Sequence, residues 1–512
     1  MKRLWALFIC AGIALGWTGP AKAIDFKTKG QWLMGFTLAD DKLVHSTRLG
    51  DEREKNTDDK FQAKQRVRLQ LDAAASESLS GTVYFEIGTQ NWGQASDGAA
   101  LGADGRDVIK LKRAYIDWAM PDAPLKVRMG IQGMTLPNVA GGSAIMDTDV
   151  AGITANYDIN DNVGVTVLWA RPLNDNFNGT SPYKSNRAQA GYLDNLDLFS
   201  LMVPVRLDGA EITPWIMYGM KGRNSMYGIA QWQGFHDGVY TADGNLNYSL
   251  YPYPGIYDRD RLSDTTKTYG NMFWAGLPIS ITAFDPWNIE IDINYGYTES
   301  MGHYWAYKDR FSSRRSANTE REGWLAKALL EYKTDWVTPG ILGWYASGDD
   351  SNPKNGSERM PSIVPMGTFT SFLGDGNLGW AWNDYALDYS GTWGVGIQLA
   401  DISFLESLKH TFRAVYWGGT NSTGMIKYMT TPYAWNDGWA SGTSPYLTTE
   451  DSLLEFNLVT NYQMYENFEI NLDLAYVANF IDNSAWEKAN IRDASFNKQD
   501  AWKAQLVFAY SF

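Results

Sequence analysis

The sequence WKAQLVFAYSF, residues 502–512, alternates between two kinds of side chain and decides the fold. Every second residue from Trp502 to Phe512 is apolar or aromatic, whereas Lys503, Gln505 and Ser511 lie between them. A period of two is that of a β-strand with one apolar and one polar face. A soluble β-sandwich gives the same pattern, so the rest of the chain has to distinguish the two.

The length of this strand matches a membrane. Residues 502–512, at about 3.3 Å per residue and a tilt of about 45°, cover about 25 Å, and aromatic side chains stand at both ends of the strand. In lipid every backbone N–H and C=O needs an internal partner, so strands can cross only as a closed barrel. The last strand must therefore pair with an early one, and KTKGQWLMGF (27–36) is the candidate.

The same alternation recurs along the chain, for example in AKQRVRLQLD (63–72), LKVRMGIQ (125–132), NIEIDINYGY (288–297) and NFEINLDLAY (467–476). The connections are alternately short and long. The long ones span 38–60, 91–107, 133–150, 172–194, 222–268, 300–322, 348–390, 420–450 and 481–499. This plan predicts an all-β, antiparallel, up-and-down transmembrane β-barrel with short periplasmic turns and long extracellular loops. We expect about 18 strands, with 16 as the alternative.

The N-terminal residues read as a cleaved secretion signal. Lys2 and Arg3 precede the apolar segment 4–17, which is too short to span a bilayer as a helix, and Ala21-Lys22-Ala23 fits a cleavage site. We therefore expect a signal peptide at 1–23, export through the periplasm and a single barrel domain at 24–512. The one cysteine, Cys10, lies in the signal, so no disulfide is expected.

Charge and motifs argue against several classes of function. Loss of residues 1–23 removes Lys2, Arg3 and Lys22 and no acid, so the net charge goes from −14 to −17, which disfavours nucleic acid as a partner. The four histidines are not spaced as metal ligands, and no hydrolase or nucleotide-binding motif occurs. We predict no enzyme activity, no metal site and no cofactor; weak Ca²⁺ binding by Asp349-Asp350 stays open.

Basic residues on the polar faces of early strands are the candidate pore lining. They are Lys64, Arg66, Arg68, Arg113, Lys126 and Arg128. Each would cost about 2–4 kcal/mol on the lipid face near the midplane, so they should face the lumen. The loop 133–150, with Gly141-Gly142 and the acids Asp147 and Asp149, is the candidate constriction loop opposite them. The alternative is that the basic groups only pair with lumen acids and that the two aspartates lie in an ordinary turn.

The polar faces of later strands are acidic. The residues are Glu290, Asp292, Glu455, Glu469 and Asp473. We interpret them as a hydrated inner wall that also favours cations. Because the basic strip acts in the opposite direction, the sequence leaves ion selectivity open.

Two stretches carry a resemblance to a known family. The first is the final aromatic pattern Phe508, Tyr510, Phe512, which resembles that of bacterial porins. The second is LKRAYIDWAMPDAPLKVRMGIQGM (111–134), which resembles the homotrimeric porins of sulfate-reducing bacteria. The resemblance implies a homotrimer in the bacterial outer membrane, in contact with lipid and lipopolysaccharide. It also implies that the barrel-assembly machinery reads the aromatic pattern.

The resulting prediction is a general-diffusion porin for passive transport of small hydrophilic solutes and ions. A substrate-selective channel, preferring sugars or anions, is the alternative, because the loops are rich in Trp and Tyr. A barrel enzyme is a third candidate. Saturable block of the ion current by a solute would distinguish the second from the first.

Overall fold

The computed structural model describes residues 24–40, 43–46, 60–102, 109–174, 195–222, 267–308, 313–376, 387, 389–428, 446–486 and 496–512. The expected signal, residues 1–23, lies outside them. No helix in these ranges is long and apolar enough to cross a membrane.

Twenty strand segments form one sheet in the described residues. They are β1 (Asp25–Asp40), β3 (Lys60–Ser76), β4 (Leu79–Asn91), β5 (Ile109–Ala119), β6 (Leu125–Thr135), β7 (Asp147–Asp158), β8 (Gly164–Asn174), β9 (Asn195–Met202), β10 (Val205–Leu207), β11 (Ala210–Ile212), β12 (Trp215–Gly222), β13 (Tyr269–Ile281), β14 (Trp287–Thr298), β17 (Arg321–Tyr332), β18 (Thr338–Ala346), β19 (Thr392–Leu405), β20 (Leu408–Gly419), β21 (Ser452–Tyr465), β22 (Phe468–Asn479) and β24 (Ala501–Ser511).

These 20 segments form 18 antiparallel strands of the barrel, because two of the barrel strands are each interrupted by a proline. Pro204 separates β9 from β10 and Pro214 separates β11 from β12, because proline has no N–H to donate to a ladder. β9 and β10 therefore count as one barrel strand, and β11 and β12 as another. The described residues therefore confirm the expected count of 18 and exclude 16.

The barrel closes between its first and last strands. β1 pairs with β24 from Gln31↔Ser511 to Asp40↔Trp502, so the predicted partner of the final strand is confirmed. Beyond the last pair, the backbones of Gly30 and Phe512 exchange two hydrogen bonds of 2.7 and 3.0 Å. Closure leaves no edge along this seam in the apolar region, as a lipid environment requires.

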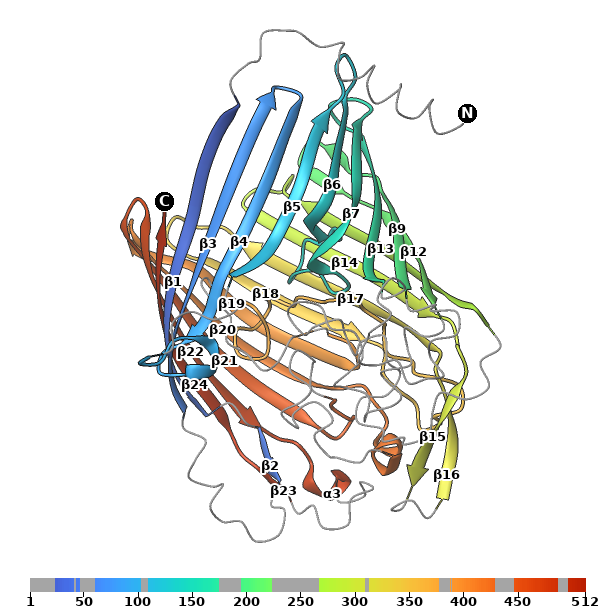
Figure 1. Cartoon of the computed structure of the whole chain (residues 1–512). Coiled ribbons are helices and arrows are strands. Elements are labelled where there is room, and N and C mark those ends of the chain that lie inside the picture. The colour runs from blue at the N-terminus through green and yellow to red at the C-terminus, as the bar shows by residue number, and fades with distance from the viewer. Residues whose placement is uncertain are drawn as a thin grey trace, which may run out of the picture.

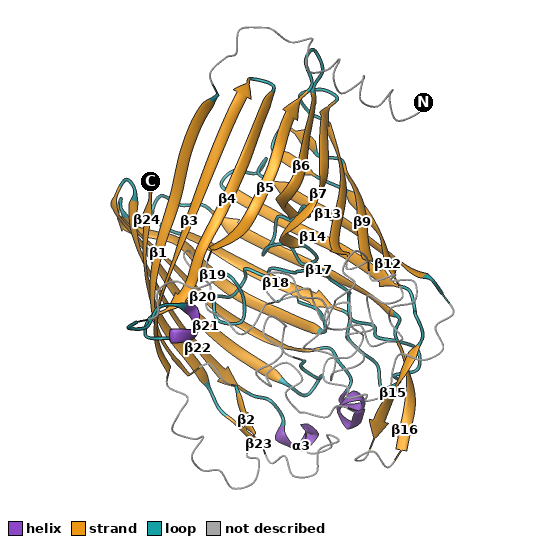
Figure 2. Ribbon diagram, viewed as in Figure 1, coloured by secondary structure: helices purple, strands orange, loops and turns teal. Residues whose placement is uncertain are grey.

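Short turns connect the strands at one end of the barrel and long loops at the other (Figures 1 and 2). Small elements occur in the long loops: the pairs β2 (Val44–Ser46) with β23 (Phe496–Lys498) and β15 (His303–Lys308) with β16 (Ser313–Asn318), and the helical turns η2 (Ala95–Asp97), η6 (Thr423–Tyr428) and α3 (Asn483–Trp486).

The outer face of the barrel is apolar. Ile116, Ile216 and Ile293 are each about half exposed there (49%, 48% and 49%). Aromatic pairs border this belt. Trp287 on β14 and Tyr332 on β17 meet next to the short turns, and Trp324, nearer the long loops on β17, stacks on Tyr345 of β18. An apolar band between two aromatic girdles is the surface of a membrane-spanning barrel.

Part of the inner face is also apolar, in contrast to the polar inner face that the alternating sequence pattern predicts. Trp274, Trp344 and Trp417 point inward and are at most 5% exposed, because the loops between β6 and β7 and between β18 and β19 pack on them. The barrel therefore contains a hydrophobic core on one side of its lumen. Strands that face lipid outside and this core inside lose the simple polar alternation.

Candidate functional site: a constriction inside the barrel

The β6–β7 hairpin leaves the barrel wall at its loop end. β5 pairs with β6 only up to Ala114↔Ile131, and β7 pairs with β8 only up to Gly152↔Ala170. β6 and β7 stay paired with each other as far as Thr135↔Asp147. The end of the hairpin has thus separated from both neighbouring strands, and the loop 136–146 that follows it is folded into the barrel (Figure 1).

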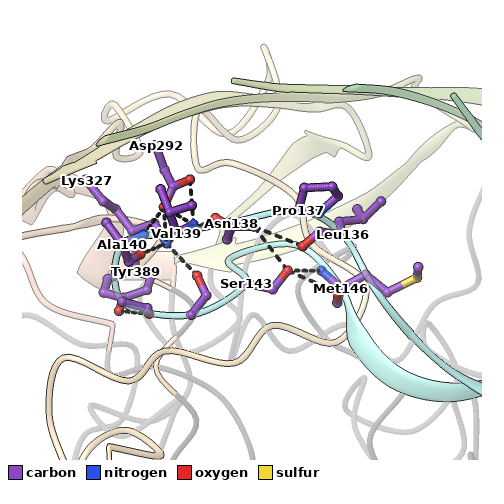
Figure 3. Close-up of polar contacts among 12 residues, drawn as sticks. Leu136, Pro137, Asn138, Val139, Ala140, Ser143, Met146, Asp292, Lys327 and Tyr389 are labelled. Carbon is purple, nitrogen blue, oxygen red and sulfur yellow. Dashed lines mark hydrogen bonds and ion pairs between the residues drawn. The ribbon is translucent and has the colours of Figure 1, made fainter. Parts of the chain in front are cut away.

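A buried ion pair on the opposite wall holds this loop. The carboxylate of Asp292 on β14 accepts the N–H groups of Val139 and Ala140, at 3.2 and 2.7 Å. Lys327 on β17 lies 3.4 Å from Asp292 and donates to the carbonyls of Ala140 and Gly142 (Figure 3). Both ionic side chains are about 1% exposed. Because the loop backbone replaces water around both charges, the pair is stable only with the loop in place.

A second loop runs beside the first. Segment 357–376, between β18 and β19, donates backbone hydrogen bonds to it from Ile363 to Ile145 (2.8 Å), Met366 to Ser143 (2.7 Å) and Thr368 to Gly141 (2.9 Å). The N–H of Asp147 returns one to Val364 (2.8 Å). We call residues 136–146 and 357–376 together the crossbar.

The far end of the crossbar is anchored on β21, β22 and β24. Glu455 accepts the N–H of Phe372 at 2.8 Å, and Asp473 accepts the hydroxyl of Ser371 at 2.8 Å. Lys503 lies 2.8 Å from Asp473. The interpretation of Asp292, Glu455 and Asp473 as a hydrated wall is therefore wrong: all three are buried and bind loop backbone or side chains. The crossbar thus connects β14 and β17 to β21, β22 and β24 through the interior of the barrel.

A glycine makes the contact between the two loops possible. Gly142 has φ = 84°, and a Cβ at this position would lie 2.4 Å from the carbonyl oxygen of Met366. Gly142→Ala should separate the two loops, because the new methyl clashes with backbone that cannot move aside. We expect faster cleavage of the folded protein by an added protease within 136–146 or 357–376. The same cleavage rate as for Gly102→Ala, at an open position with φ = 77°, would contradict this.

Basic side chains face the lumen from β3. Leu71 is exposed on the outer face, so Lys64, Arg66 and Arg68 point inward; their role as a pore lining stays a prediction. Arg68 Nε lies 2.8 Å and Arg66 Nε 4.0 Å from the Glu86 carboxylate on β4. Lys64 is only 1% exposed, so Arg66 and Arg68 provide the accessible charge.

Arg113 and its neighbour Lys112 bridge β5 to the inward hairpin. Each lies 2.6 Å from the carboxylate of Asp149 on β7. A β-bulge at Tyr84/Phe85 opposite Arg113/Leu111 inserts Lys112 as an extra residue. Lys112 was missed in the sequence, although the apolar positions change parity between Leu111 and Ala114, which marks the bulge. The Arg113 guanidinium packs on Gly133, where a Cβ would lie 2.8 Å from Arg113 Cζ.

Acidic groups face this basic wall from the hairpin and the crossbar. Asp147 and Asp149 begin strand β7 and are not in the loop, which corrects the sequence-based assignment. Asp147 accepts the hydroxyl of Thr135 at 2.8 Å. Asp375, on the crossbar, interacts electrostatically with Asp147. Basic and acidic surfaces that face each other produce a transverse electric field.

Asp375 should make the channel sensitive to pH. Burial and the neighbouring Asp147 raise the pKa of Asp375 to about 6, against the opposing effect of Lys503; Arg413 also reaches the adjacent Gly376 carbonyl, at 2.8 Å. Below pH 6 this carboxyl is neutral, so the site loses one negative charge. Reversal potentials in a salt gradient should shift toward anions between pH 7.5 and 5. Asp375→Asn should remove most of that shift, and an equal shift in the variant would contradict the assignment.

Lys126 and Arg128 lie elsewhere. Arg128 forms a two-pronged ion pair with Asp117 (2.7 and 2.9 Å), and both basic residues line a cavity of about 500 Å³ toward the short turns. They therefore do not continue the basic wall formed by β3 and β5. The aromatic pattern of β24 lies on the outside: Phe508 stacks on Phe468, and Tyr510 stacks on Phe512.

Metal binding gains no support in the described part of the chain, where no group of His, Cys, Asp and Glu could hold an ion. Asp349, one of the two aspartates considered for Ca²⁺, is buried and accepts hydrogen bonds from Ser357 and Tyr446. The neighbouring Asp350 accepts the N–H of Asn352 and the amide of Asn355.

No protein-family model and no curated protein matches the chain. The resemblance to porins of sulfate-reducing bacteria thus remains an expectation. Three crystal structures illustrate the solved proteins that are similar to it, all from Pseudomonas aeruginosa. OccK11 (OpdR) is 9% identical, OccK3 (OpdO) 13%, and OpdK, determined with vanillate, 9%. Each alignment covers 95% of this chain and 96%, 96% and 98% of the other, with TM-scores of 0.47, 0.47 and 0.48.

Proposed function

We propose that this protein is a substrate-selective, anion-preferring channel of the bacterial outer membrane. The observation that carries the proposal is the crossbar, which fills one side of the lumen with a dry core. The polar surface left for water and solutes is the wall made by β3, β4 and β5 with the facing hairpin. A general-diffusion porin needs a wide aqueous lumen, so general diffusion is less favoured than selective transport.

The charge of this wall supports a preference for anions. Four accessible basic residues lie on β3 and β5, namely Arg66, Arg68, Lys112 and Arg113, and Glu86 and Asp149 are among their direct partners. An excess of fixed positive charge in a narrow, low-dielectric passage raises the local concentration of anions. Asp147 and Asp375 lie on the side of the passage opposite β3 and β5. They do not neutralise the basic wall, and the electric field between the two surfaces orients dipolar solutes.

Single-channel recording in planar bilayers tests this proposal. With a tenfold KCl gradient, we expect small current steps. The reversal potential should have the sign expected when chloride is more permeant than potassium. Large steps with a reversal potential near zero would instead support general diffusion. A folded protein without current would contradict a channel of either kind.

The assembly of the protein remains a proposal that rests on the sequence resemblance. We propose a homotrimer embedded among lipid and lipopolysaccharide, whose assembly uses the aromatic pattern Phe508, Tyr510 and Phe512. Chemical cross-linking of the purified protein at micromolar concentration should trap trimers. Monomers alone would contradict the trimer without affecting the proposed channel.

A further inference from the structure

The cavity that contains Arg128 lies on the inner wall between the crossbar and the short turns. Its volume of about 500 Å³ is in the range of small-molecule sites. It extends from Met146 at the crossbar to Ser78, in the turn between β3 and β4, and to Ser80 at the start of β4. A solute that passes the constriction toward the short turns therefore meets this cavity next.

The floor of the cavity is apolar. Met134, Met146, Leu168 and Met202 line it, and each is at most 9% exposed. Methionine side chains are flexible and polarisable, so such a floor adapts to apolar groups of different shapes. These four side chains belong to the hydrophobic core beneath the crossbar, and the cavity reaches the edge of that core.

A pair of opposite charges stands over this floor in a fixed geometry. The Arg128 guanidinium meets both oxygens of Asp117 and lies 4.0 Å from the centre of the Tyr115 ring. Gln132, only 2% exposed, donates to the backbone carbonyls of Arg128 (3.3 Å) and Gly152 (3.0 Å) and accepts from Thr154 (3.2 Å). The strand that carries Arg128 is thus held in position from below.

Both members of the pair can still bind a ligand. The side chains of Arg128 and Asp117 are 39% and 37% exposed. A guanidinium has five N–H donors, of which two contact Asp117, and each carboxylate oxygen has a second lone pair. Lys126 and Glu77 line the same cavity and add one charge of each sign. The site therefore offers donors and acceptors side by side with nearly balanced charge.

We propose that this cavity binds zwitterionic amino acids with apolar side chains. The ligand carboxylate contacts Arg128 and Lys126, its ammonium group contacts Asp117, and its side chain packs on the methionine floor. A simple anion would be repelled by Asp117, and a simple cation by Arg128. The inference rests on the proposed function only in placing the cavity on the path of transported solutes.

Calorimetric titration of the purified full-length protein in detergent tests the ligand class. The probes are L-leucine, 4-methylpentanoate (leucine without its amine), 3-methylbutylamine (leucine without its carboxylate) and glycine. We expect leucine to bind at least about tenfold more tightly than each of the others, since each lacks one charged or apolar contact. Equal binding of 4-methylpentanoate would overturn the zwitterion site, and equal binding of glycine would overturn the role of the methionine floor.

Two variants locate the site. Asp117→Asn should weaken leucine binding about tenfold without weakening that of 4-methylpentanoate, and Met202→Ser should weaken binding of leucine but not of glycine. Asp161→Asn, in the exposed turn after β7, is the matched control and should bind as the parent does. Unchanged leucine binding in both site variants would overturn the proposal. Channel recordings on the same samples separate the two hypotheses: current without leucine binding refutes only the binding site, and binding without current refutes only the channel.

Discussion

Lys327→Met should release the loop 136–146 and enlarge the pore. The substitution leaves the Asp292 carboxylate buried without its counter-charge and removes the donor to the carbonyls of Ala140 and Gly142. Breaking a buried pair from one side costs about 3–5 kcal/mol, and the loop can relieve that cost by moving away so that water reaches Asp292. We expect a clear rise in single-channel conductance and new protease cleavage within 136–146.

A control and a rescue distinguish this effect from general damage. Lys333→Met removes a lysine from the exposed turn after β17 and should leave conductance unchanged. Adding Asp292→Asn to Lys327→Met removes the unpaired charge but keeps an acceptor for the N–H of Ala140, so part of the closed state should return. Parental conductance in Lys327→Met would show that the ion pair does not hold the loop.

Combined replacement of Arg66, Arg68 and Arg113 by alanine should reverse the ion preference of the channel. Glu86, Asp149, Asp147 and Asp375 would then face the passage with few basic partners. At an effective dielectric constant of about 20, one unit charge changes the energy of an ion about 7 Å away by about 2 kcal/mol before salt screening. The reversal potential in a KCl gradient should change sign from the anion side to the cation side.

The comparison variant for this triple replacement is Arg206→Ala. Arg206 lies on β10, exposed next to a short turn, so its loss changes the net charge but not the passage. Arg128→Ala should also have little effect on the reversal potential, because Arg128 lies outside the basic wall. A triple variant that keeps the parental reversal potential would contradict the assignment of the passage to this wall.

The architecture could be predicted from the sequence because its cause is local. The alternation in 502–512 and 27–36 predicted that the last strand pairs with the first. The alternation of short turns and long loops predicted the number of strands. The inward orientation of Arg66 and Arg68 follows from the same local pattern, because a period of two fixes the face once the apolar side is known. The placement of Arg113 also followed, since Ile116 and Trp118 face outward.

The site depended on contacts between residues far apart in the sequence. Asp292 meets Val139 and Ala140 across more than 150 positions, and no local pattern encodes that approach. One signal was available: Lys327 lies on the same strand face as Leu325 and Leu329, and a lysine between apolar residues indicates a buried partner. The acidic residues were misassigned because a buried anchor and a hydrated wall use the same residue types.

The dry core beneath the crossbar limits how this protein can be converted into a wider nanopore. Deleting 136–146 or 357–376 would expose the inward indole rings of Trp274, Trp344 and Trp417 to water. Such a surface favours collapse of other loops onto it or adhesion of passing apolar solutes. To obtain an open lumen, the inner face of the wall would have to be redesigned together with the loops, because each of these apolar surfaces shields the other from water.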